Sequence, residues 1–210
     1  MHGCFDELAD LAREIGHSAQ DEWILVGDLL NKGPDSRGVL DWARANGVRT
    51  ILGNHEARFL DAAGLEPSAR SGKDRRILDS VGEDFAAYAE WIRTWPLWIE
   101  WPDVVSVHAG LEPGVATLAG MRRRVLLTIR TWDGTGEDLD REGDPAWHQV
   151  VQWPVPVVHG HWAAAGLVDL PHCKGLDTGC VYGGKLTAWS PDEDRFWQVP
   201  ARREYVPFKD

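Results

Sequence analysis

Short apolar segments that end in a polar residue recur along this chain. The first of them, residues 23–26, is typical of a buried strand and runs directly into Gly27-Asp28 and a loop that contains glycine and proline. Three further apolar segments end in the same way, so that four potential ligands follow strands: Asp28, Asn54, His108 and His161. Side chains at strand ends commonly build a binding site, so we expect a fold that carries its site on the loops there.

Helices and strands are predicted to alternate in the first half of the chain, which indicates an α/β fold. The helical spacing of apolar residues predicts helices over residues 8–15, 39–43 and 85–92. Short strands are expected at residues 23–26, 48–52, 97–101, 104–107, 155–158, 176–181, 186–189 and 196–199. Residues 58–83 are polar and broken by glycine and proline, so we expect an exposed insertion or cap there, within a single domain that covers residues 1–210.

Charge and composition exclude several classes of partner. Lys and Arg number 22 against 33 Asp and Glu, and the formal net charge of −11 argues against nucleic acid as a partner. A phosphorylated substrate would need local cations or metals to overcome this field. No apolar run approaches the ~20 residues that cross a bilayer, and no signal peptide is visible, so we expect a cytoplasmic protein without membrane contact. Three cysteines without CxxC spacing fit a reducing compartment.

The residue types at the strand ends indicate a metal site. Carboxylate, imidazole and amide oxygen together suit borderline metals such as Mn, Fe, Co or Zn. His2, at the start of the chain, is a fifth candidate ligand. No cysteine is among these candidates, so a structural zinc site is not expected. A single histidine beside a strand is more often an ordinary core or loop residue, but four such coincidences are much harder to dismiss.

The candidate residues also form an ordered set of short motifs. In chain order these are His2-Gly3, Gly27-Asp28, Asn31-Lys32-Gly33, Gly53-Asn54-His55-Glu56, His108-Ala109-Gly110 and Gly160-His161. With these motifs the chain resembles the calcineurin-like metallophosphoesterases, in their phosphoprotein phosphatase branch, from residue 1 to about residue 189. Arg130-Thr131-Trp132-Asp133-Gly134 and Leu176-Asp177-Thr178-Gly179 look closest to the symmetrical diadenosine tetraphosphatases and the small bacterial serine/threonine protein phosphatases. The resemblance implies a four-layer sandwich of two β-sheets flanked by helices.

The resemblance implies a dinuclear metal centre. Asp28 would be shared by two divalent ions, His2 would bind the first ion, and the second would be bound by Asn54, His108 and His161. Manganese is the expected metal, with Fe, Co, Zn, Ni or Mg as alternatives. Two such ions would activate a bridging hydroxide that attacks phosphorus in line.

The resemblance also implies catalytic roles for three further residues. Lys32 and Arg130 would stabilise charge on the phosphoryl oxygens, and His55 would be the general acid for the leaving oxygen. Two positions depart from the pattern of many eukaryotic protein phosphatases. Asn31 stands where those enzymes have an aspartate paired with the acid histidine, and Lys32 stands where they have arginine.

The beginning of the chain departs most from the family pattern. The family's first motif has a strand and then Gly-Asp, whereas this chain begins with Met1-His2. We expect Met1 to occupy the variable position of a Gly-Asp-Met-His-Gly motif, with the strand and its Asp encoded upstream. The other explanation is a shortened protein with a weakened first metal site.

The implied activity is metal-dependent hydrolysis of phosphate esters or anhydrides. Phosphoserine/threonine proteins and dinucleoside polyphosphates are both possible substrates. A tryptophan-rich wall around Trp132 and Trp162 could stack an adenine, which favours nucleotides slightly. The alternative is a phosphate- or nucleotide-binding protein with weak or no turnover, because the first metal site lacks its Asp. The sequence leaves the oligomeric state open.

Overall fold

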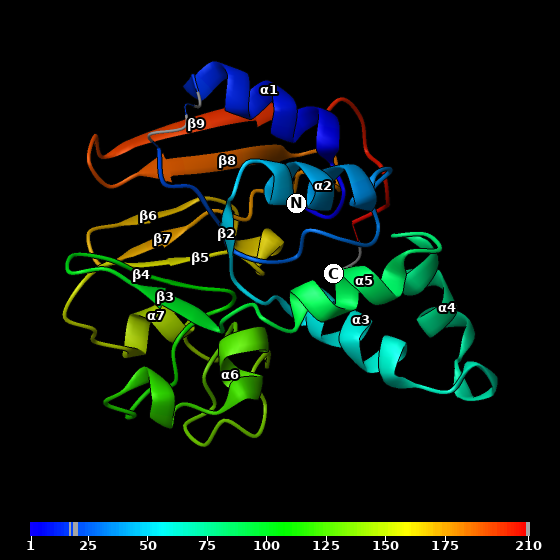
Figure 1. The fold of residues 1–210 in the computed structure, drawn as a ribbon. Helices are drawn as coiled ribbons and strands as arrows, with labels where there is room; N and C mark the ends of the chain where they lie inside the picture. Colours follow the sequence, from blue (N-terminus) through cyan, green and yellow to red (C-terminus); the bar gives the residue numbers. More distant parts are fainter. Residues whose placement is uncertain (17, 19–20, 209–210) are drawn as a thin grey trace.

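The computed structural model describes residues 1–16, 18 and 21–208 and has a mixed α/β fold in four layers. In Figure 1 helix α1 lies above strands β8 and β9, the strands β3 to β7 lie below them, and helices α6 and α7 cover the lower side. In chain order the helices are α1 (Phe5–Ile15), α2 (Ser36–Ala45), α3 (Asn54–Gly64), α4 (Gly72–Asp79), α5 (Phe85–Ile92), α6 (Arg123–Thr128) and α7 (Trp147–Val150). The strands are β1 (Ile24–Leu25), β2 (Arg49–Thr50), β3 (Trp98–Glu100), β4 (Val105–Val107), β5 (Val157–His159), β6 (Val168–Leu170), β7 (Cys173–Gly175), β8 (Lys185–Ser190) and β9 (Arg195–Pro200).

The described strands form three sheets. β1 and β2 are a parallel pair, and β8 and β9 are an antiparallel hairpin. The largest sheet has the order β3-β4-β5-β7-β6, with β4, β5 and β7 parallel and the two edge strands antiparallel to their neighbours. The C-terminal ends of parallel neighbours lie at the same edge, so the loops after β4 and β5 emerge side by side.

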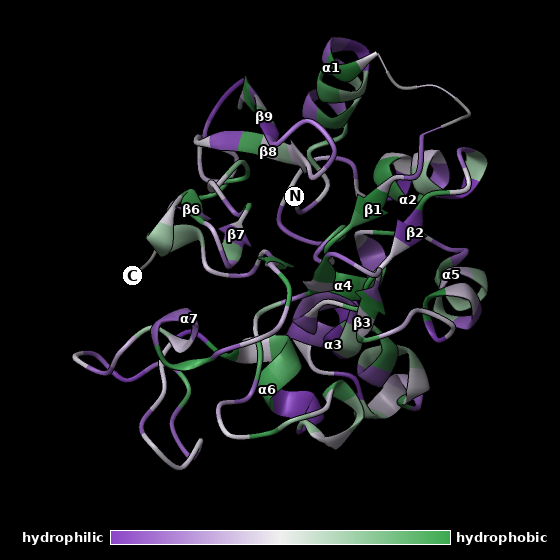
Figure 2. Ribbon diagram, turned by 90° about the vertical axis from the view of Figure 1, so that its left-hand side faces the viewer, coloured by the Kyte–Doolittle hydropathy of each residue, from purple (hydrophilic) through white to green (hydrophobic). Residues whose placement is uncertain are grey.

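Helix α1 is amphipathic, because one face packs on the β8–β9 hairpin and the other is exposed to solvent. Leu8 and Leu11 are buried, whereas Arg13 and Glu14 are exposed. Figure 2 shows this alternation as green and purple turns. Gly16 ends the helix with φ +77°, a left-handed conformation that glycine adopts without a side-chain clash.

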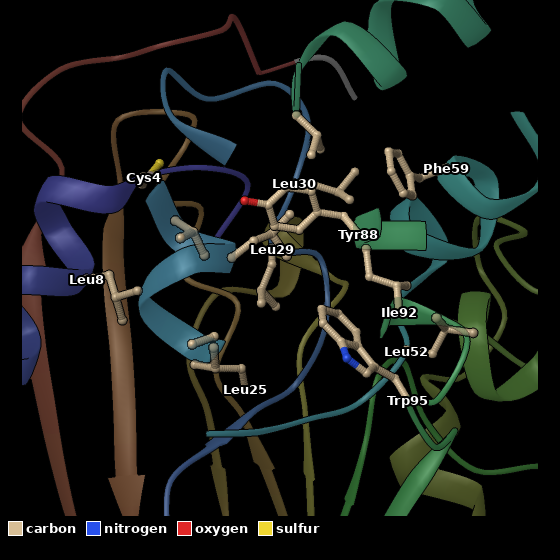
Figure 3. Packing of buried hydrophobic residues seen from close by; sticks show 14 of the residues in the cluster. Cys4, Leu8, Leu25, Leu29, Leu30, Leu52, Phe59, Tyr88, Ile92 and Trp95 are labelled. Atoms are coloured by element: carbon tan, nitrogen blue, oxygen red, sulfur yellow. The ribbon is translucent and has the colours of Figure 1, made fainter. Parts of the chain in front are cut away.

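A hydrophobic core to which α1, α2, α3 and α5 contribute, the upper core, fixes the loop after β1. Leu29 and Leu30 follow Asp28 directly, and both are buried at 1% and 0% relative exposure. Figure 3 shows them packed among residues of several elements: Cys4, Leu8, Leu25, Leu52, Phe59, Tyr88, Ile92 and Trp95. Burying a leucine side chain contributes roughly 1.5–3 kcal/mol, so the two leucines anchor the backbone that presents Asp28.

The structure confirms the three predicted helices and most of the predicted strands, with shifted bounds. The strand predicted at residues 176–181 is wrong, because the chain turns there and Gly179 has φ +70°. The strands β6 and β7 lie just before it instead. Residues 58–83, expected as an insertion or cap, contain the end of α3 and all of α4. Phe59 and Ile77 of this segment are buried in the upper core, and its role as a cap stays a prediction.

Candidate metal centre

Asp28 lies at the centre of the candidate site, three residues after the end of β1. The residue is 6% exposed, and its two oxygens face different imidazoles. Oδ1 lies 3.5 Å from Nε2 of His108, and Oδ2 lies 3.6 Å from Nε2 of His2. Burial acts to raise the pKa of this carboxyl, but His108, His55 and His2 hold the pKa well below its ordinary value. The ionised carboxylate can therefore serve two cations, one with each oxygen.

A second buried carboxylate, Glu56, holds the loop that presents Asp28. It lies in the first turn of α3 and accepts hydrogen bonds from the backbone N–H groups of Asp28 (2.8 Å), Leu29 (2.8 Å) and Leu30 (3.3 Å). A fourth bond comes from the N–H of Gly53 at 3.0 Å. Burial first, and the nearby Asp28 carboxylate second, raise the pKa of Glu56 to about 7. Glu56 thereby fixes the two loops that carry Asp28 and Asn54 relative to each other.

Left-handed backbone conformations are concentrated at the same residues. Among the described residues other than glycine, six have a positive φ, and five of these six are site candidates or their neighbour Asn31. The five are His2 (58°), Asp28 (55°), Asn31 (71°), Lys32 (66°) and His161 (67°). A side chain in this region costs of order 1–3 kcal/mol, which surrounding contacts must impose. Strain gathered in this way marks a functional site.

Three candidate ligands meet on one side of Asp28. Asn54 begins α3, His108 follows β4, and His161 lies two residues past β5. The amide oxygen of Asn54 lies 2.9 Å from Nε2 of His108 and 3.2 Å from Nδ1 of His161. His108 donates its Nδ1–H to the carbonyl of Val26 at 2.7 Å, which leaves the lone pair of Nε2 directed at Asp28. Burial and then His108 lower the pKa of His161 to about 3, so this ring is neutral.

These groups direct lone pairs, not hydrogen atoms, at one another. The end of the Asn54 side chain faces only acceptors, namely the two ring nitrogens and the carboxylate of Asp28, and with its amide turned over its NH₂ would donate to all of them. The ligand atoms of Asp28, His108 and His161 lie within 4.8 Å of one another. A divalent cation between them would satisfy all of these lone pairs, and the mixture of imidazole, carboxylate and amide oxygen suits such an ion. The residues on this side therefore fit a metal.

The other side of Asp28 carries fewer ligand atoms among the residues that the structure describes. His2, Asp28 and His55 offer atoms within 4.8 Å of one another, and the rings of the two histidines have their centroids 4.5 Å apart. The backbone N–H groups of His2 and Gly3 donate to the carbonyls of Asp28 and Leu29, both at 2.7 Å, so residue 2 is tied to the central loop. Burial lowers the pKa of His2 well below its ordinary value.

His55 is oriented by Asn31. The Nδ2 amide of Asn31 lies 3.0 Å from Nδ1 of His55. An amide NH₂ can only donate, so Nδ1 accepts and the neutral ring carries its proton on Nε2. Burial, as the largest cause, lowers the pKa of His55 to about 4. A neutral ring with a proton on Nε2 can still donate a hydrogen bond to an oxygen.

Lys32 lies on the His2 side of Asp28, and Arg130 lies on the His161 side. Nζ of Lys32 is 3.4 Å from Nε2 of His2 and donates to the hydroxyl of Tyr182 at 2.6 Å. Arg130 donates from Nη1 to Asp140 at 2.5 Å. The positive charge of Arg130 contributes to the lowered pKa of His161. The structure thus brings Lys32 against the metal-ligand candidates, whereas Arg130 is held by an acidic partner.

The sequence matches a family model at nearly full length. The Calcineurin-like phosphoesterase model covers residues 1–188. The chain belongs to this family. It is therefore a hydrolase of the metallophosphatase type, and the mixed α/β fold agrees with that assignment. Calcineurin-like phosphoesterases use divalent metals, for which the cluster around Asp28 supplies suitable ligands.

Curated relatives of this phosphoesterase share one name. Proteins of Tolumonas auensis and Ralstonia nicotianae, both named symmetrical bis(5'-nucleosyl)-tetraphosphatase, are 30% and 32% identical to it. The alignments cover 95% and 98% of this chain, and 94% and 90% of the relatives. A crystal structure of a protein provisionally named diadenosine tetraphosphatase superposes with a TM-score of 0.83 at 30% identity, covering 95% of this chain and 90% of that one.

Sequence reasoning missed two partners of the predicted catalytic residues in this phosphoesterase. Tyr182 binds Lys32 across 150 positions of the chain, and Asp140 binds Arg130. The tyrosine lies in the loop after the Leu176–Gly179 motif, which was the one signal that could have pointed to it. Within the part of the chain that the structure describes, no helix is long and apolar enough to cross a membrane.

Proposed function

We propose that this protein hydrolyses dinucleoside polyphosphates with two divalent metal ions, and that manganese is the preferred metal. The observation that carries the proposal is the convergence of lone pairs on Asp28 from both sides, in a chain whose relatives are named symmetrical bis(5'-nucleosyl)-tetraphosphatase. Names of hydrolases among the relatives favour an enzyme over a binding protein without turnover. We also retain the cytoplasmic location as part of this proposal.

The proposed ligands divide between the two oxygens of Asp28. Asn54, His108 and His161 would hold one ion, and His2 would hold the other. When bound, such ions supply an activated water and Lewis-acid stabilisation of a phosphoryl group. The protein's own contribution is to hold these ligands in fixed, neutral or anionic forms, which the lowered pKa values of Asp28 and His161 support.

Three side chains would act on the phosphate groups directly. Lys32 lies beside His2 and can donate a hydrogen bond to a phosphate oxygen. Its hydrogen bond to the hydroxyl of Tyr182 would then weaken. Arg130 can do the same if its guanidinium exchanges Asp140 for phosphate, and its planar shape suits two oxygens at once. His55, expected as the general acid, would donate a hydrogen bond from Nε2 to the leaving oxygen, because the neutral ring keeps its proton.

The test compares three substrates on the same manganese-loaded protein: diadenosine tetraphosphate, a phosphoserine peptide and p-nitrophenyl phosphate. We expect the highest kcat/KM on diadenosine tetraphosphate, with ADP as the sole nucleotide product, because symmetrical cleavage gives two identical halves. EDTA should abolish turnover. A higher kcat/KM on the phosphopeptide would assign the protein to the protein phosphatases instead, and inactivity on all three substrates would overturn the proposal.

A further inference from the structure

Two aromatic rings, those of Tyr182 and Phe208, lie one after the other next to Lys32. The hydroxyl of Tyr182 accepts the hydrogen bond from Nζ of Lys32 at 2.6 Å, and the same Nζ lies 5.1 Å from the centroid of the Tyr182 ring. On its other side Nζ is 3.4 Å from His2. Lys32 thus stands between the candidate metal ligands and an aromatic ring.

The second ring belongs to Phe208. It packs against Tyr182 edge to face, with centroids 4.9 Å apart and an interplanar angle of 87°. Phe208 is 43% exposed and is one of only four large hydrophobic residues that are exposed in the described part of the chain. An edge-to-face contact covers at most one face of each ring, so much of the Phe208 ring is open to a ligand.

The segment that carries Phe208 is fixed onto the loop of Tyr182. The N–H groups of Tyr205 and Val206 donate to the carbonyl of Val181 at 3.1 and 3.2 Å. Upstream, the buried Glu7 of α1 accepts from the backbone N–H of Arg202 at 2.9 Å and from the hydroxyl of Tyr205 at 2.8 Å. In Figure 1 this segment is the red trace that returns from β9 towards the middle of the molecule. Phe208 therefore reaches Tyr182 through an ordered path.

We infer that Phe208 and Tyr182 form a stacking site for a nucleobase of a nucleotide whose phosphates bind at Lys32. This inference rests on the proposed function and names the residues that would select nucleotides. A nucleotide places its base beyond its phosphates, in the same order as the aromatic pair and Lys32. Stacking on aromatic side chains is sequence-tolerant because every base has a π-face. A phosphoserine peptide without aromatic residues gains nothing from these rings.

The sequence also offers Trp132 and Trp162 as a wall that could stack an adenine. Trp132 lies two residues from Arg130, and its ring lies 6.0 Å from the guanidinium of Arg122, so it belongs to the arginine side of the site. The two locations make different predictions for the same ligand, and variants of Phe208 and Trp132 separate them.

The first experiment measures binding, so it does not depend on turnover. ADP and inorganic pyrophosphate are titrated into the manganese-loaded wild type, Phe208→Ala, Phe208→Trp and Trp132→Ala by calorimetry. We expect Phe208→Ala to weaken ADP about tenfold relative to pyrophosphate, and Phe208→Trp to restore it. Leu65→Ala, which shortens a side chain of similar exposure (40%) directly after α3, is the matched control and should leave the ratio of the two affinities unchanged.

The second experiment measures the ratio of kcat/KM for diadenosine tetraphosphate to that for a phosphoserine peptide without aromatic residues. Phe208→Ala should lower this ratio about tenfold. The stacking site is wrong if Phe208→Ala changes ADP and pyrophosphate binding equally, or if Trp132→Ala alone lowers ADP affinity. Failure of the proposed function gives a different result: the wild type would not hydrolyse diadenosine tetraphosphate, whatever its ADP affinity.

Discussion

The two sides of Asp28 differ in how many ligands the described residues offer. On one side Asn54, His108 and His161 come from the ends of three ordered elements. On the other side the described residues place His2 beside Asp28, with Nζ of Lys32 3.4 Å from Nε2 of His2. Ligand number sets metal affinity, so we expect the Asn54 side to bind its ion tightly and the His2 side to bind its ion weakly.

Lys32 makes the weak side dependent on substrate. A lysine cation and a divalent cation that share one imidazole repel each other, by about 4 kcal/mol per pair of unit charges at 4 Å near a protein surface. A phosphate group between them would turn this repulsion into attraction. We therefore expect the ion at His2 and the phosphate to bind cooperatively, and the ion at Asn54, His108 and His161 to bind independently.

The largest effect is expected at the residue that the two sides share. Asp28→Asn removes the carboxylate that both proposed ions would share, so kcat/KM for diadenosine tetraphosphate should fall roughly 10³-fold. Asp61→Asn, the same change at an exposed position of α3, should leave kcat/KM within about twofold. A loss below tenfold for Asp28→Asn would mean that Asp28 bridges nothing.

The next effect separates the two sides. Manganese titrations followed by calorimetry should find one tight and one weak ion in the wild type. His161→Ala should weaken the tight ion about 100-fold, whereas His2→Ala should weaken only the weak ion. If His2→Ala removes the tight ion, the assignment of the two sides is reversed.

A smaller effect is expected from the brace at Glu56, which supports the Asn54 side. Glu56→Gln replaces two acceptor oxygens by one oxygen and one NH₂ that faces backbone N–H groups, so the free energy of unfolding should fall by about 2 kcal/mol. Urea unfolding in EDTA measures it. Glu14→Gln, on the exposed face of α1, is the control and should stay within about 0.5 kcal/mol. Equal stability of both variants would show that the loop keeps its conformation without the hydrogen bonds to Glu56.

The smallest effect concerns a property that the two sides share, which is a buried histidine with a lowered pKa. Burial lowers the pKa of His161 to about 3 and that of His55 to about 4. Below pH 6.5 the unfolded chain protonates these rings while the folded protein does not, so stability falls as pH decreases from 6.5 towards 4. Between pH 6.5 and 5.5 each ring should cost about 1 kcal/mol in EDTA, because the unfolded ring is already half protonated at pH 6.5.

The matching variants assign this loss to each ring. His161→Gln and His55→Gln should each reduce the pH-dependent loss by a similar amount, measured by urea unfolding at the two pH values. His172→Gln changes an exposed histidine and should leave the loss unchanged. A pH-dependent loss of stability that survives both substitutions would come from other titratable groups. It would contradict the assignment to His161 and His55.

Sequence reasoning reached the ligand cluster because its signal is local. Asp28, Asn54, His108 and His161 each follow an apolar segment within a few residues, so strand-end position alone predicted that they would meet. The bond from Lys32 to Tyr182 spans 150 positions and depends on how the loop after β7 folds back. The pair of Arg130 and Asp140 depends on the shape of one acidic loop. Neither contact leaves a periodic pattern in the sequence.

The error at residues 176–181 has the same origin. Leu176 and Val181 gave that stretch the apolar character of a strand, but Gly179, Gly183 and Gly184 allow a sharp turn. The backbone N–H groups of Gly184 and Lys185 bond back to the carbonyls of Gly179 and Thr178. The glycines therefore decide the conformation of this stretch more than its apolar residues do. The resulting turn positions Tyr182.

The brace at Glu56 bears on how the protein acquires its metals. Many metal sites form only when the ion arrives, so folding contributes to their selectivity. Here one buried carboxylate holds the backbone of Asp28, Leu29, Leu30 and Gly53 through four hydrogen bonds. The loop has little room to adapt to a preferred ion. Occupancy should then follow the supply of metals and their general order of affinity, so protein purified from cells grown on different metals should carry different ions.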